Sequence, residues 1–334
     1  MPAPPTLMRL TEVHRDAVSL HDGRAEHVAR QWPKLLRALA DDDTALAVGD
    51  WVWAARPLAG ELWVIERVAP QSHLVRRDGD GRRHAVASNV DTALLVMGLD
   101  DDFNLRRLER YLALLHGSGV LPVLVLSKAD VVAGTPRRLP DCLAALRGRL
   151  PSALPVLAVN GTEIAAAQAL MPWLQAGQTL VLLGSSGAGK STLINTLLGA
   201  AVQDTGAVRA HDSRGKHTTT ARSLHRLPTG ACVIDTPGLR TLQADRGEAA
   251  LASSFDDVQR LAAQCRFRNC RHLDEPGCAV RGGLDADRLR NFHKLLREAR
   301  RDTMSPLERQ RQIAQWKERG RAGHARAKAK REAP

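Results

Sequence analysis

Residues 184–192 read Gly184-Ser185-Ser186-Gly187-Ala188-Gly189-Lys190-Ser191-Thr192. The apolar run before them, 178–183, is typical of a buried strand, and the run 193–198 after them is typical of a helix. This context favours a phosphate-binding loop over a plain glycine-rich turn, because the backbone N–H groups and the helix start converge on one anion. We therefore expect all nine residues to bind nucleotide phosphates, with Lys190 at the outer phosphates and the Ser191 hydroxyl on Mg²⁺.

A second motif follows an apolar strand pattern at 231–234 and reads Asp235-Thr236-Pro237-Gly238. At this place it has the form of the Asp-x-x-Gly element of a GTPase. Asp235 is expected to hold the Mg²⁺ shell through water, and the Gly238 N–H to contact the γ-phosphate.

A guanine-binding motif is predicted at Ser127-Lys128-Ala129-Asp130, which follows the buried strand pattern 122–126 and resembles Asn-Lys-x-Asp. Asp130 would accept two hydrogen bonds from guanine, and adenine lacks that pair of donors. Ser127 replaces the usual Asn and offers fewer contacts, so guanine affinity could be modest. The alternative is a surface Lys/Asp pair after a buried strand. Asn160-Gly161 stands where a third base-binding loop is expected.

The order of these motifs is unusual, because Ser127 precedes Gly184 by 57 residues. An ordinary GTPase has the phosphate loop first and the guanine motif later. The alternation of strand and helix patterns from 89 onward predicts a parallel sheet covered on both faces. We therefore expect an α/β fold with a circularly permuted GTPase domain at 89–245.

The segment between these motifs contains Arg214-Gly215-Lys216-His217-Thr218-Thr219-Thr220. We expect it to be switch I, with Thr218 and Thr219 closing on Mg²⁺ and the γ-phosphate. Leu239 stands where many GTPases have a water-positioning Gln, and leucine offers no hydrogen bond. His217 is the local candidate for that role, and an exposed loop histidine is the equal alternative. The predicted catalytic residues are His217, Lys190 and Asp235.

The first 88 residues carry several short strand patterns separated by Gly-rich turns, which is typical of a small OB-like barrel. Basic residues and tryptophans in this domain could bind RNA. Equally, Trp51, Trp53 and Trp63 could fill the barrel core.

A cluster of sulfur and imidazole groups lies in the predicted C-terminal domain, 246–334. Three of the five cysteines fall there, as Cys265-x4-Cys270-x-His272-x5-Cys278. Three thiolates and one imidazole complete a closed tetrahedral site, so we expect one structural Zn²⁺ per chain.

The formal net charge is +12, and residues 290–334 hold 14 Lys/Arg against 5 Asp/Glu. A basic helical tail of this kind favours a polyanionic partner such as RNA, although it could be only a solvated charged helix. No stretch resembles a secretion signal or is apolar enough to span a bilayer. We expect a cytoplasmic protein without a membrane partner.

These features together resemble the ribosome small subunit-dependent GTPase A family (RsgA, YjeQ or EngC), over nearly the whole chain. The resemblance implies GTP hydrolysis stimulated by the small ribosomal subunit, a role in the late maturation of that subunit, and contacts with its rRNA. In the family the stretch matching Lys216–Thr220 is switch I, and its histidine, here His217, has been considered catalytic. GTP, GDP and the subunit are the expected partners of a monomer.

Two other functions compete with this interpretation. The chain could be a GTPase acting on tRNA or another RNA, although the permuted order with a zinc segment argues against it. It could also be an RNA-binding module with a vestigial nucleotide site. The intact Lys190, Ser191 and Asp235 argue against that alternative.

Overall fold

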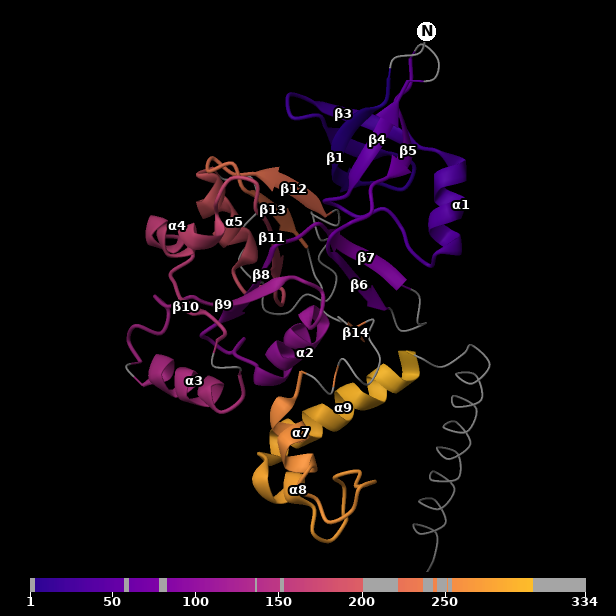
Figure 1. Ribbon diagram of the computed structural model, residues 1–334. Helices are drawn as coiled ribbons and strands as arrows, with labels where there is room; N and C mark the ends of the chain where they lie inside the picture. The colour runs from indigo at the N-terminus through magenta and orange to yellow at the C-terminus, as the bar shows by residue number, and fades with distance from the viewer. Residues whose placement is uncertain are drawn as a thin grey trace, which may run out of the picture. The chain divides into compact units, whose positions relative to one another are not determined.

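A computed structural model describes residues 4–56, 60–77, 83–135, 137–150, 153–200, 222–236, 243–244, 251 and 254–302 of the chain. The chain divides into two compact units, Met1–Asp245 and Arg246–Pro334. The first unit holds the barrel and the GTPase sheet (Figure 1). The second holds the Cys/His cluster.

The described N-terminal strands close into a barrel in the order β1-β2-β3-β5-β4, with β4 pairing back onto β1. Alternation along β4 decides the inner face, since Val52 and Ala54 are fully buried while Trp51 and Trp53 are 38% and 36% exposed. The idea that Trp51 and Trp53 fill the core is therefore wrong. The strands are β1 (Thr6–Val13), β2 (Val18–His21), β3 (Glu26–Gln31), β4 (Trp51–Ala55) and β5 (Trp63–Arg67).

Two parts of the N-terminal region differ from the expected small barrel. Helix α1 (Pro33–Asp41) stands between β3 and β4; Pro33 occupies its first turn, where the missing N–H costs no helical bond, and Leu39 is buried. The hairpin β6 (His73–Arg77) and β7 (Arg83–Ser88) lies outside the barrel. It forms a separate sheet in which β6 also pairs with β14 (Gln243–Ala244), a partner remote in sequence.

The GTPase sheet is parallel from β10 to β13 in the order β10-β9-β8-β11-β13, and β12 pairs antiparallel with β13. Every residue of β8 and β11 is buried, which is why these strands are continuous apolar runs. The expected parallel sheet is confirmed. Its strands are β8 (Thr92–Gly98), β9 (Leu121–Ser127), β10 (Val156–Ala158), β11 (Thr179–Leu183), β12 (Ser223–Arg226) and β13 (Cys232–Asp235).

Helices cover both faces of this sheet (Figure 1). Alternate residues of β8 point to opposite faces, so Leu95 joins one apolar cluster and Leu94 the other. The cluster of Leu95 includes residues of α2 (Leu105–Leu115) and α3 (Arg138–Arg147). The cluster of Leu94 includes residues of α4 (Ile164–Leu170) and α5 (Lys190–Leu198), and the short helix η1 (Met171–Trp173) follows α4.

The barrel and the GTPase sheet are continuous in hydrogen bonding. β1 pairs with β12 at Glu12 and Ser223, which joins the strands into one 11-stranded sheet. The Arg9 guanidinium adds a side-chain link, donating to the Thr179 hydroxyl at the start of β11 over 3.2 Å. The barrel is thus attached to the strand that leads into residues 184–192.

The second unit has a small apolar core among its described residues. The Phe255 and Phe292 rings pack edge-on with centroids 5.3 Å apart, and Val280 is fully buried. Arg288 pairs with Asp257 over 2.9 Å. The helices are α7 (Asp256–Ala262), α8 (Ala279–Gly283) and α9 (Ala286–Asp302).

Candidate functional site

The loop Gly184–Gly189 turns from β11 into α5, whose first turn contains Lys190, Ser191 and Thr192. A Cβ on Gly184 would lie 2.4 Å from the Val96 carbonyl oxygen, so only glycine allows the loop to pass this close to β8. Gly189 has a φ of 89° just before the helix, a conformation that other residues rarely adopt. The strand, turn and helix that the sequence predicts are all present.

The Lys190 ammonium lies across this loop. Its Nζ donates to the carbonyl oxygens of Gly184 and Ser185 over 3.0 Å and 2.7 Å, and its side chain is buried. Burial lowers the pKa of Lys190, while the negative charges of Asp235 and Asp102 oppose that shift. A cation is thus held where the turn of backbone N–H groups would receive an anion.

Asp235 ends β13 at the same carboxyl edge of the sheet and is only 3% exposed. Burial raises the pKa of its carboxyl, and the nearby Lys190 charge works in the opposite direction. The next residue, Thr236, donates its hydroxyl to the Leu182 carbonyl over 2.5 Å, which fastens the end of β13 to β11. The carboxylate and the ammonium therefore belong to one site.

The predicted guanine motif follows β9 and contacts the phosphate loop. The buried Ser127 hydroxyl donates to the Ala188 carbonyl over 2.6 Å, so serine still ties the two motifs together. Lys128 has a φ of 60°, a strained conformation of the kind found at functional sites. The Ala129 N–H donates to the Val159 carbonyl, and Asp130 is exposed.

The loop Asn160-Gly161 also lies beside the phosphate-loop helix. Thr196 of α5 donates its hydroxyl to the Gly161 carbonyl over 2.6 Å. The Asn160 amide nitrogen donates to the Glu163 carboxylate over 2.6 Å. Three loops that are remote in sequence thus meet around 184–192.

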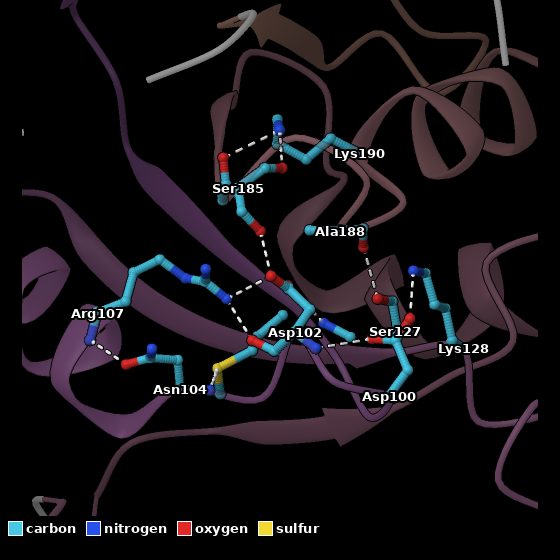
Figure 2. Close-up of polar contacts among 12 residues, drawn as sticks. Asp100, Asp102, Asn104, Arg107, Ser127, Lys128, Ser185, Ala188 and Lys190 are labelled. Atoms are coloured by element: carbon cyan, nitrogen blue, oxygen red, sulfur yellow. Dashed lines mark hydrogen bonds and ion pairs between the residues drawn. The ribbon is translucent and has the colours of Figure 1, made fainter. Parts of the chain in front are cut away.

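The segment between β8 and α2 places a further group of side chains at this edge, which no sequence motif predicted. Asp100 pairs with the Lys128 ammonium over 2.6 Å, and Asp102 accepts the Ser185 hydroxyl over 2.5 Å (Figure 2). Arg107 on α2 pairs with Asp102 over 2.6 Å. The available signal was the run of three aspartates directly after a buried strand, at the sheet edge where ligands bind.

Several predicted site residues lie outside the described part of the chain. These are His217, Thr218, Thr219 and Gly238.

The four predicted metal ligands come together in the second unit. Their ligand atoms all lie within 4.8 Å of one another. The His272 Nδ1 is 3.7 Å from the Cys265 sulfur and 3.6 Å from the Cys278 sulfur. Zinc bond lengths in a tetrahedral site place sulfur and nitrogen ligands about 3.5 Å apart, so the donor set fits that metal. The four residues are Cys265, Cys270, His272 and Cys278.

Among the described helices, none is long and apolar enough to cross a membrane.

Comparison with known proteins gives consistent similarities. The family model described as RsgA GTPase matches residues 68–245. The "Small ribosomal subunit biogenesis GTPase RsgA" of Xanthomonas oryzae pv. oryzae (strain MAFF 311018) is 44% identical over 296 residues, covering 86% of this chain and 79% of that protein. The protein of that name from Xanthomonas axonopodis pv. citri (strain 306) is 44% identical over 299 residues, covering 87% of this chain and 80% of the relative.

Two solved structures share the fold. One is described as YloQ, a circularly permuted GTPase, with a TM-score of 0.60 and 20% identity over 90% of this chain and 97% of that one. The other is YjeQ from Thermotoga maritima, with a TM-score of 0.62 and 21% identity over 88% of this chain and 98% of that one. The strand order observed here agrees with the expected circular permutation.

Proposed function

Because this chain belongs to the RsgA GTPase family, and is therefore a GTPase, we propose that it hydrolyses GTP on the small ribosomal subunit during late maturation of that subunit. The name of its relatives supports the subunit as partner. The observation that carries the proposal is the meeting of Lys190, Asp235 and the guanine motif at one sheet edge. We further propose that the chain acts as a monomer in the cytoplasm, where it contacts rRNA.

The geometry supports the following proposed division of roles. The N–H groups of 184–192 and the Lys190 ammonium bind the phosphates, and the Lys190 charge stabilises negative charge that develops on them. The Ser191 hydroxyl and the Asp235 carboxylate would hold Mg²⁺, which neutralises charge on the phosphate oxygens when it is bound. The Asp130 carboxylate accepts the two donors of guanine.

The experiment that tests this function is GTP turnover by the purified protein, with and without purified small ribosomal subunits. We expect the subunit to raise the rate of GTP turnover clearly. Stimulation by tRNA instead would favour the GTPase that acts on another RNA. Binding of RNA without any GTP turnover would favour the module with a vestigial nucleotide site.

We propose His217 as the residue that positions the attacking water, since Leu239 cannot do so. Replacing His217 by Ala should lower subunit-stimulated turnover about a hundredfold, because a positioned general base or water-orienting group typically contributes that much. GTP affinity should stay nearly unchanged. Single-turnover assays with bound subunit measure the first quantity, and equilibrium titration measures the second.

Lys190→Ala is the comparison for this variant, because it should damage both binding and turnover. Full stimulated activity in His217→Ala would mean that backbone groups or the ribosome hold the water.

The outer face of the barrel has the chemistry of an RNA-binding surface. Trp51 and Trp53 are exposed on β4. Exposed aromatic faces can stack on bases. We propose that this face and the basic tail contact rRNA.

Binding to the small subunit should therefore fall steeply with salt. If the basic groups neutralise several phosphates, the affinity should drop roughly a hundredfold between about 50 and 200 mM salt. Deleting residues 320–334 should reduce that slope and leave GDP affinity unchanged. Sedimentation with subunits across a salt series measures the slope, and association that does not depend on salt would contradict the prediction.

A further inference from the structure

The segment Leu99–Asn104, between β8 and α2, contacts both halves of the nucleotide site (Figure 2). Toward the base half, the Asp100 carboxylate pairs with Lys128 over 2.6 Å. Toward the phosphate half, the Asp102 carboxylate accepts the Ser185 hydroxyl over 2.5 Å. Ser185 directly follows the glycine at which the phosphate loop leaves β11.

The Asp102 carboxylate is fixed from several sides. One oxygen accepts the Gly98 N–H over 3.1 Å, and the other accepts both the Ser185 hydroxyl and the Arg107 guanidinium, the latter over 2.6 Å. Arg107 lies in the first turn of α2. Its backbone N–H donates to the side chain of Asn104, the residue that caps this helix. The side chains of Asp102 and Arg107 are 15% and 25% exposed, which limits solvent competition for the pair.

Ser185 is held at two points as a result. Its hydroxyl donates to Asp102, and its carbonyl oxygen accepts the Lys190 ammonium over 2.7 Å. These bonds fix the first turn of the loop whose later N–H groups must point at one anion. A fixed loop binds more tightly than a mobile one, because less ordering is left to occur on binding.

The negative charge of Asp102 allows two possible effects of this residue on nucleotide binding to be distinguished. A carboxylate close enough to act on the Lys190 charge disfavours the phosphates that Lys190 would bind. If Asp102 acted only through its charge, its removal would strengthen nucleotide binding. If it acts by holding Ser185, its removal weakens binding.

We propose that Asp102, itself held by Arg107, is a positioning residue for the phosphate loop and acts through Ser185. The inference rests on the proposed role of 184–192 as that loop. It extends the site to a segment that no sequence motif identified.

The test compares variants in equilibrium displacement of a fluorescent GDP analogue by GDP and by IDP, which lacks the guanine 2-amino group. Asp102→Ala and Ser185→Ala should each weaken GDP about tenfold, the scale of one lost hydrogen bond to a charged group. Ser185→Thr, which keeps a hydroxyl, should retain GDP affinity. The ratio of GDP to IDP affinity should stay unchanged in all three, because the base half of the site is intact.

Asp101→Ala is the matched control, since it removes the same charge from an exposed neighbour. It should leave GDP affinity within about twofold, as is usual for surface substitutions. The double variant Asp102→Ala with Ser185→Ala should lose no more than either single variant, because both remove the same bond.

Unchanged or tighter GDP binding in Asp102→Ala would overturn the inference, as would additive losses in the double variant. Loss of the preference for GDP over IDP would also overturn it, because it would indicate general damage to the site. If the unmutated protein does not bind GDP, the phosphate-loop assignment itself fails and the inference fails with it.

Discussion

Replacing Cys270 by Ser should release zinc from the second unit and unfold the segment 265–278. The segment has few apolar side chains to bury, and its chain path passes through left-handed positions at His272 and Gly277. A structural zinc site contributes apparent binding energies of about 10–16 kcal/mol near neutral pH, and this energy appears as folding energy. A domain is commonly stable by only about 5–15 kcal/mol, so the metal decides whether the segment folds.

Two measurements check this result. Metal analysis of protein prepared without chelator should give one zinc per chain for the unmutated protein and much less for Cys270→Ser. Limited proteolysis of Cys270→Ser should cut the chain near 265–278, while GDP binding by the first unit of this variant persists. Cys232→Ser is the control, because Cys232 lies on β13, outside the cluster. Absence of stoichiometric zinc from the unmutated protein would refute the assignment.

The features that sequence could predict are those in which local chemistry dictates local structure. The turn between β11 and α5 needs Gly184 and Gly189, because neither the close approach to Val96 nor the positive φ suits another residue. The parallel sheet was recognisable because strands buried on both faces must be apolar throughout. The four predicted metal ligands lie within fourteen residues, so their spacing alone indicated that they come together.

The features that sequence did not predict depend on partners far away along the chain. Asp102 and Ser185 are 83 residues apart, and nothing local to either residue points to the other. The hairpin β6–β7 leaves the barrel for a sheet completed by β14, more than 150 residues later in the chain. The Ser127 hydroxyl donates to the Ala188 carbonyl oxygen over 2.6 Å, although the two residues are 61 positions apart and no local pattern indicates the contact.

Replacing Asp130 by Asn should make the protein bind XTP more tightly than GTP. The Asp130 carboxylate can accept both guanine donors, whereas an amide offers one acceptor and one donor. Xanthine carries a carbonyl where guanine carries the amino group, and the new amide N–H can donate to it. The amide oxygen still accepts one guanine donor, so one hydrogen bond to a charged group is lost. At about 1.5–3 kcal/mol, this loss should lower GTP affinity about ten- to a hundredfold. Displacement of a fluorescent GDP analogue by GTP, XTP and ATP measures the change.

The matched control is Asp101→Asn, which makes the same chemical change at another exposed carboxylate that follows β8 instead of β9. Asp101→Asn should still bind GTP more tightly than XTP, because Asp101 has no proposed role in binding the base. ATP should bind poorly to every variant, since adenine presents neither the donor pair that Asp130 accepts nor the carbonyl that an amide would meet. Equal binding of ATP and GTP by the unmutated protein would mean that residues 127–130 do not read the base. The exposed position of Asp130 would then be that of an ordinary surface carboxylate after a buried strand.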